Sequence, residues 1–144
     1  MSTSGTLTLE LHAMPEEVMR GVEELRAFGR EHQIEENALF GLALALEECG
    51  TNIVHYACHD QAHEQFCVIF ERSAETLTIE LRDHGPAFDP TNAVVLEPAA
   101  TDDDCSPGGW GIHLARHYMD EIRYTREDDE NVLRMIKRLA PHAA

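Results

Sequence analysis

Five short segments of the chain have the apolar and β-branched composition that is typical of strands. The first, 6–11, alternates apolar and polar residues and stops before Pro15, as expected of a strand with one buried face. The other four segments are 66–73, 76–83, 121–127 and 131–139. Short polar turns separate the second from the third and the fourth from the fifth. We therefore expect two β-hairpins, the later one turning around Asp128 to Glu130.

Two longer segments carry apolar residues at the spacing of helices that bury one face. The first runs from Glu16 to about His32, and the second from about Glu35 to Ala57. The apolar stripe of the second segment is Leu39, Leu42, Leu46, Cys49, Ile53 and Ala57. A third helix is predicted over 111–119. Strands and helices mixed in 144 residues predict a single α+β domain over 1–144.

The net charge narrows the classes of partner. A formal charge of −16 argues against nucleic acid and against anionic membranes, because like charges repel. No apolar run is long enough to span a bilayer, and the first residues lack the pattern of a signal peptide.

The cysteines Cys49, Cys58, Cys67 and Cys105 show neither paired metal spacing nor a disulfide framework. This usage favours a reducing, cytoplasmic environment.

A second, polar stripe lies opposite the apolar stripe of the second helix. It consists of Glu48, Asn52, His55 and His59. Residues four apart on a helix have Cβ atoms about 5–6 Å from each other, so Glu48 and Asn52 can reach one shared ligand. Glu47 points about 100° away from them. The ordinary alternative is that this stripe is simply a solvated helix face.

The segment RDHGPAFDP, residues 82–90, places Asp83 at the end of a strand, followed by Gly85 and Phe88. A carboxylate at a strand end can accept hydrogen bonds from the amino group of a ligand. A glycine two residues later lets the backbone approach that ligand closely. The ordinary alternative is a structural Asp-His-Gly-Pro turn.

Glycines lead directly into the third predicted helix. Gly108, Gly109 and Gly111 lie in the segment SPGGWGIHLARH, and helix N-termini present unpaired amides that bind phosphates. The alternative is a flexible hinge. The pattern is neither a dinucleotide-binding fingerprint nor a Walker A loop. The preceding residues, 84–109, form a long segment of loop composition, which is typical of a functional lid or of disorder.

Two further clusters suggest other chemistry only weakly. Cys58, His59 and His63 could be read as metal ligands, although such residues are common after a helix end. Cys105 could be read as a reactive thiol, but the neighbouring acids Asp102, Asp103 and Asp104 would raise its pKa.

Taken in order, the three motifs E-x-x-x-N, D-x-G-x-x-F and G-G-x-G resemble the ATP-binding (Bergerat) fold of gyrase, Hsp90, histidine kinases and MutL. The chain is more closely similar to the bacterial anti-sigma-factor serine/threonine kinases of the histidine-kinase-like ATPase superfamily. The likeness extends from the first strand to the last. It implies a two-layer α/β sandwich, with a mixed, mostly antiparallel sheet covered by helices on one face.

The resemblance also implies a role for each matching residue. Glu48 corresponds to the general base, and Asn52 to the Mg²⁺ ligand. Asp83 corresponds to the residue that reads the adenine amino group. The remaining nucleotide-binding positions implied by the resemblance are Gly85, Phe88, Gly108, Gly109, Gly111 and Ile112. An ATP lid is expected over about 91–109.

The function implied by the resemblance is phosphorylation of an anti-sigma-factor antagonist with a STAS-type domain, using ATP and Mg²⁺. The protein would also sequester a sigma factor or a similar regulator, and the resemblance allows a homodimer. Two alternatives remain: a non-catalytic switch that binds partners according to its nucleotide, and a detached ATPase domain of a sensor kinase.

Overall fold

The computed structural model describes residues 4–56, 65–92 and 112–139. The elements in chain order are β1 (Gly5–His12), α1 (Pro15–Glu31), α2 (Glu36–Tyr56), β2 (Gln65–Arg72), β3 (Thr76–Asp83), the 3₁₀ turn η2 (Pro90–Asn92), α3 (His113–Tyr118), β4 (Glu121–Glu127) and β5 (Glu130–Arg138). Among these described elements, no helix is long and apolar enough to cross a bilayer.

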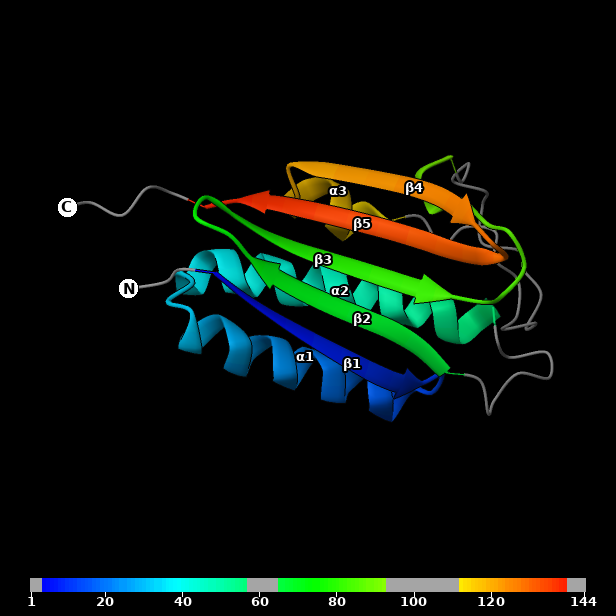
Figure 1. The fold of residues 1–144 in the computed structure, drawn as a ribbon, viewed down its shortest axis with the longest axis horizontal. Coiled ribbons are helices and arrows are strands. Elements are labelled where there is room, and N and C mark those ends of the chain that lie inside the picture. Colours follow the sequence, from blue (N-terminus) through cyan, green and yellow to red (C-terminus); the bar gives the residue numbers. More distant parts are fainter. Residues whose placement is uncertain (1–3, 57–64, 93–111, 140–144) are drawn as a thin grey trace.

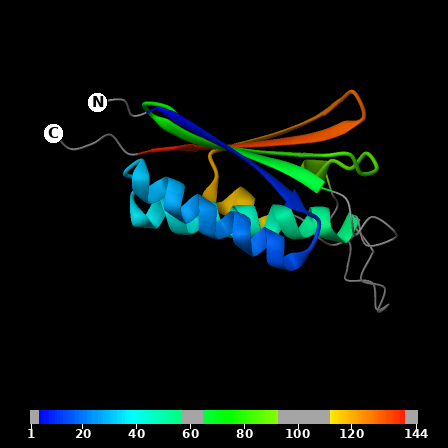
Figure 2. The same ribbon diagram turned by 60° about the horizontal axis from the view of Figure 1, so that its bottom comes forward.

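The strands form one five-stranded sheet in the order β1-β2-β3-β5-β4. Each neighbouring pair is antiparallel, so the described part of the chain contains no parallel pairing. The helices α1, α2 and α3 all lie on the same face of this sheet (Figures 1 and 2). The expected two-layer α+β architecture is therefore confirmed, with an antiparallel sheet in place of a mixed one.

The core lies between the sheet and the two long helices. Alternate residues of the central strands point at the helices, and those of β2 are Phe66, Val68 and Phe70, each at most 2% exposed. The apolar stripe of α2 meets them. Its described members Leu39, Leu42, Leu46, Cys49 and Ile53 are buried, which confirms the helical spacing read from the sequence.

Element boundaries follow the local chemistry. α1 begins at Pro15, whose missing amide costs nothing in the first turn of a helix. The β4–β5 hairpin turns at Asp128 and Asp129, which have φ angles of 48° and 67°, so Glu130 belongs to β5 and pairs with Glu127. Short polar residues tolerate this left-handed conformation better than most.

The third helix is shorter than the sequence predicts. It covers only His113–Tyr118, because Met119 adopts an extended backbone with ψ of 150° and leads into β4. Gly41 allows α3 to lie close to α2, since a Cβ atom added at Gly41 would come within 2.6 Å of Cδ1 of Tyr118. This close approach brings the start of α3 near the polar stripe of α2.

Candidate functional site

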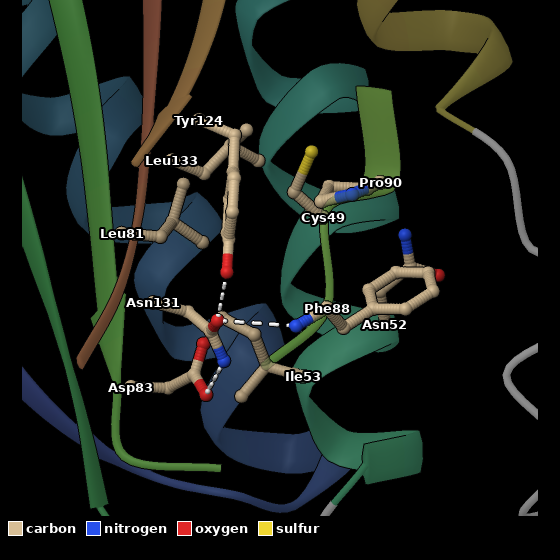
Figure 3. A pocket seen from close by; sticks show the side chains of 10 residues that line it. All are labelled: Cys49, Asn52, Ile53, Leu81, Asp83, Phe88, Pro90, Tyr124, Asn131 and Leu133. Atoms are coloured by element: carbon tan, nitrogen blue, oxygen red, sulfur yellow. Dashed lines mark hydrogen bonds between the residues drawn. The ribbon is translucent and has the colours of Figure 1, made fainter. Parts of the chain in front are cut away.

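A pocket opens between α2 and the sheet, beside the last residues of β3, the first residues of β5 and the middle of β4 (Figure 3). Its empty volume is about 310 Å³, including the part that is open to solvent. The lining residues are Cys49, Asn52, Ile53, Leu81, Asp83, Phe88, Pro90, Tyr124, Asn131 and Leu133. The walls are mostly apolar, and a few polar groups converge inside, which is the usual make-up of a small-molecule site.

Asn52 lies on the α2 wall of this pocket and is only 4% exposed. A buried amide in the middle of a helix must be accommodated by polar contacts or face a ligand, because leaving it unsatisfied is costly. The solvated-face interpretation of the polar stripe is therefore wrong at Asn52. His55, one turn later, is half-buried, and His59 lies outside the described residues.

Asp83 ends β3 on the opposite wall and is 7% exposed. Its Oδ1 accepts two hydrogen bonds, from the backbone amide of Gly85 at 2.9 Å and from Nδ2 of Asn131 at 3.0 Å. Burial raises the pKa of Asp83 above its ordinary value, and these two hydrogen bonds oppose that rise. Both hydrogen bonds end on Oδ1, so Oδ2 is the oxygen that can accept from a ligand.

The loop after Asp83 is held in place from two sides. The backbone oxygen of Gly85 accepts a hydrogen bond from Nη1 of Arg126 at 2.9 Å, and the amide of Phe88 donates to Oδ1 of Asn131 at 3.2 Å. These contacts keep the Phe88 side chain in the pocket wall (Figure 3). The pocket therefore brings together Asn52, from the helix motif, with Asp83 and Phe88, from the motif that follows β3.

Glu48 is placed differently. It does not line the pocket, and its Oε1 accepts a hydrogen bond of 2.9 Å from the backbone amide of Ala115. Ala115 is in the first turn of α3, whose N-cap residue Ile112 has no side-chain oxygen to satisfy that amide. Glu48 therefore caps α3 from a neighbouring helix and lies one turn before Asn52 on α2.

Several predicted residues cannot be placed. Gly108, Gly109 and Gly111 lie outside the described residues, as do Cys58, His59, His63, Cys105 and the lid residues from 93 onward. Ile112, which follows the glycines, is buried directly before α3. The described start of the lid is the 3₁₀ turn η2, where Asp89 Oδ1 accepts a 2.8 Å hydrogen bond from the amide of Thr91.

Sequence reasoning missed two pocket residues that carry polar side-chain groups, Asn131 and Tyr124. The sequence carries a signal for the first of them. Asn131, Leu133 and Met135 occupy alternate positions of β5, so the strand pattern that buries Leu133 and Met135 also buries Asn131. A polar residue in an inward-facing row is an indication of a site. Tyr124 on the edge strand β4 gives no comparable signal.

The residues present fit a nucleotide and its metal. No group of three or more His, Cys, Asp or Glu side chains that could hold a metal by themselves exists in the part of the chain that the structure describes. Mg²⁺, however, prefers oxygen ligands and is commonly bound through one or two protein oxygens together with substrate phosphates. The buried amide of Asn52 can supply one such oxygen, and the buried carboxylate of Asp83 suits a hydrogen-bond donor on a base.

The described elements form a two-layer α+β domain, with helices on one face of an antiparallel sheet and a pocket between α2 and the strands. The sequence pattern of the histidine kinase-like ATPase domain matches residues 11–137, and the chain belongs to this family. Its assignment to the anti-sigma-factor kinase group of the family is also confirmed.

Two curated relatives are named as protein kinases. The chain is 32% identical to the serine/threonine-protein kinase BtrW of Bordetella bronchiseptica over 104 residues. This alignment covers 72% of this chain and 73% of the relative. It is 25% identical over 131 residues to the serine-protein kinase RsbW of Listeria innocua, covering 88% and 83%. A crystal structure of the SiaB-SiaC complex from Pseudomonas aeruginosa contains a similar fold, with a TM-score of 0.68 at 16% identity over 90% of this chain and 88% of that one.

Proposed function

We propose that this protein is a serine/threonine-protein kinase that transfers the γ-phosphate of Mg·ATP to an anti-sigma-factor antagonist with a STAS-type domain. It also sequesters a sigma factor or a similar transcription regulator. The observation that carries the proposal is the pocket that buried Asp83 lines from the sheet and buried Asn52 lines from α2 (Figure 3). The relatives named as protein kinases support the reaction type.

In this proposal, Asp83 accepts a hydrogen bond from the adenine amino group through Oδ2. Gly85 leaves room for the base, and Phe88 covers one side of it. Such a buried hydrogen bond to a charged group contributes about 1.5–3 kcal/mol. The pocket walls Leu81, Ile53 and Leu133 supply the apolar contact with the ring.

Phosphate binding is assigned to the other end of the site. The amide oxygen of Asn52 would be a ligand of Mg²⁺, and Gly108, Gly109, Gly111 and Ile112 would supply backbone contacts to the phosphates. When bound, Mg²⁺ neutralises part of the phosphate charge. The side chains of this chain then hold the nucleotide so that the phosphates extend from the base pocket along α2.

Glu48 is the proposed general base. The hydroxyl oxygen of the substrate serine or threonine forms a bond to the γ-phosphorus, the bond from that phosphorus to the bridging oxygen of ADP breaks, and the hydroxyl proton passes to the Glu48 carboxylate. Base assistance of this kind contributes about 10²–10⁴ in rate. Oε1 is held by the amide of Ala115, so Oε2 is the oxygen assigned to the proton transfer.

A second candidate function is a nucleotide-dependent binding switch without transfer. The hydrogen bond between Glu48 and Ala115 favours the switch, because the Glu48 carboxylate already caps α3 and so has a role in the structure without catalysis. In that case α3, which directly follows the lid segment, would change position with the nucleotide and so change the surface offered to partners.

The test incubates the protein with labelled Mg·ATP and a purified antagonist domain. Glu48→Gln retains an oxygen for Ala115 but cannot take the proton, whereas Glu47→Gln changes the exposed neighbouring carboxylate and serves as the matched control. The kinase proposal expects label on a serine or threonine with wild type and Glu47→Gln, and a rate about 10²–10⁴ lower with Glu48→Gln. Nucleotide binding without any transfer by the wild type would favour the switch.

A further inference from the structure

We infer that Asn131 is the positioning residue that makes the base pocket selective for a purine carrying a 6-amino group over one carrying a 6-oxo group. This inference rests on the nucleotide site proposed above. Asn131 acts through Asp83 and through the backbone of residues 85–88. The hydroxyl of Tyr124 in turn donates a hydrogen bond to Oδ1 of Asn131 and holds its amide in place.

The hydrogen bonds of Asn131 fix which way its amide points. Nδ2 donates to Oδ1 of Asp83 at 3.0 Å and to the backbone oxygen of Pro86 at 2.9 Å. Oδ1 accepts from the amide of Phe88 at 3.2 Å and from the hydroxyl of Tyr124. Nδ2 also approaches the backbone oxygen of Gly85 at 3.4 Å. An amide side chain offers two donors and two acceptor sites, so these bonds use its capacity. Rotating the amide by 180° would place oxygen against oxygen and donor against donor.

The fixed amide orients the Asp83 carboxylate. Asn131 and the amide of Gly85 both donate to Oδ1, so the carboxylate plane is set and Oδ2 is the oxygen that remains for a ligand. The same bonds favour the charged form and oppose the pKa rise that burial causes. An ionised carboxylate is only an acceptor, which matches an amino group and repels a carbonyl oxygen.

Asn131 also closes the pocket on the loop side. Through Pro86 and Phe88 it ties the loop to β5, while Arg126 holds the Gly85 oxygen from β4. Asn131 is 4% exposed and sits among the lining residues, so its side chain is largely shielded from solvent (Figure 3). One side chain therefore sets both the acceptor and the wall of the base pocket.

The test compares the dissociation constants of ADP and IDP, which differ at position 6 of the purine, by calorimetry. The wild type should prefer ADP. In Asn131→Ala, ADP binding should weaken about tenfold while IDP binding changes little. The variant loses a hydrogen bond that orients the Asp83 carboxylate, and only the 6-amino group uses that carboxylate as an acceptor. Val132→Ala is the matched control, because Val132 is buried on the opposite face of the same strand.

The outcomes distinguish a failure of the proposed nucleotide site from a failure of the inferred role of Asn131. If the wild type binds neither nucleotide, the proposed function itself fails. If the wild type prefers ADP and Asn131→Ala keeps the same ratio of ADP to IDP affinity, Asn131 is only structural and the inference is overturned. Should Asn131→Ala not fold, Tyr124→Phe decides. It removes one bond to Asn131 and should lower the ratio about threefold, within the range of a single hydrogen bond; an unchanged ratio overturns the inference.

Discussion

Glu48 Oε1 accepts a 2.9 Å hydrogen bond from the backbone amide of Ala115, a residue 67 positions later in the chain. The acid on α2 thereby does for α3 what a serine or aspartate normally does at a helix N-cap. Because the N-cap residue Ile112 cannot make this bond, the start of α3 depends on Glu48. The proposed base is thus hydrogen-bonded to the first turn of α3.

This link predicts different effects for two substitutions of Glu48. Glu48→Ala removes the cap and should lower the free energy of unfolding by about 0.5–2 kcal/mol, the usual cost of a lost N-cap. Glu48→Gln keeps an acceptor oxygen and should cost much less. Urea denaturation of both variants measures the difference. Equal loss in the two variants would show that the amide of Ala115 does not depend on an acceptor at position 48.

Asp83 is predicted to lower the stability of the fold near neutral pH while it contributes to ATP binding. Its pKa is raised in the folded state, chiefly by burial, so the native state holds the proton more tightly than the unfolded state does. Its stabilising contribution is complete below the ordinary value of 3.8 and is lost as the pH rises through the folded-state pKa. Ionised Asp83 therefore lowers stability near neutral pH.

Asp83→Asn removes that penalty. The variant should gain stability relative to wild type as the pH rises above 3.8, while the difference stays constant below this value. Its affinity for ATP should fall about 5- to 150-fold, because an amide nitrogen then faces the adenine amino group. Thermal unfolding across pH and calorimetry with ATP make the two measurements. A variant that binds ATP like wild type would remove Asp83 from the site.

Gly41 is predicted to be required for the position of α3. The Cβ of Gly41→Ala would lie 2.6 Å from Cδ1 of Tyr118, so the tyrosine or the whole of α3 must move. Overpacking of this kind costs about 1–3 kcal/mol. Chemical denaturation should show this loss, whereas Glu23→Ala, at an exposed position of α1, should change stability by less than about 0.5 kcal/mol. Equal stability of the two variants would contradict the close approach.

The acidic run Asp102, Asp103 and Asp104 lies outside the described residues, and its role stays a prediction from sequence. Mg·ATP is anionic, so three acids before the phosphate-binding glycines should hinder closure of the lid until a basic partner covers them. Changing all three to Asn should tighten ATP binding in the absence of partner and weaken partner association, with both effects shrinking as salt rises. Titrations with ATP and with the partner, at low and at high salt, test this. If the triple variant binds both like the wild type at low salt, the acidic run is only a solvated loop.

The local pattern of the sequence was sufficient for the elements and for part of the site. The alternation in β1 and the three- and four-residue spacing in α2 are local periodicities, and each records which side of an element is buried. The order of the motifs was likewise sufficient for the family. The placement of Asp83 at the end of β3 followed from the strand prediction alone.

The partners of these residues were decided by the tertiary structure alone. β3 pairs with β5 rather than with β4, which is why Asn131 lies beside Asp83, although 48 residues separate them. The close approach of α3 to α2 at Gly41 likewise brings the amide of Ala115 to Glu48. Periodicity says which face a side chain occupies, but hydrogen bonds need a particular partner within about 3 Å. Such a partner is set by sheet order, register and helix packing, which no local segment of the sequence contains.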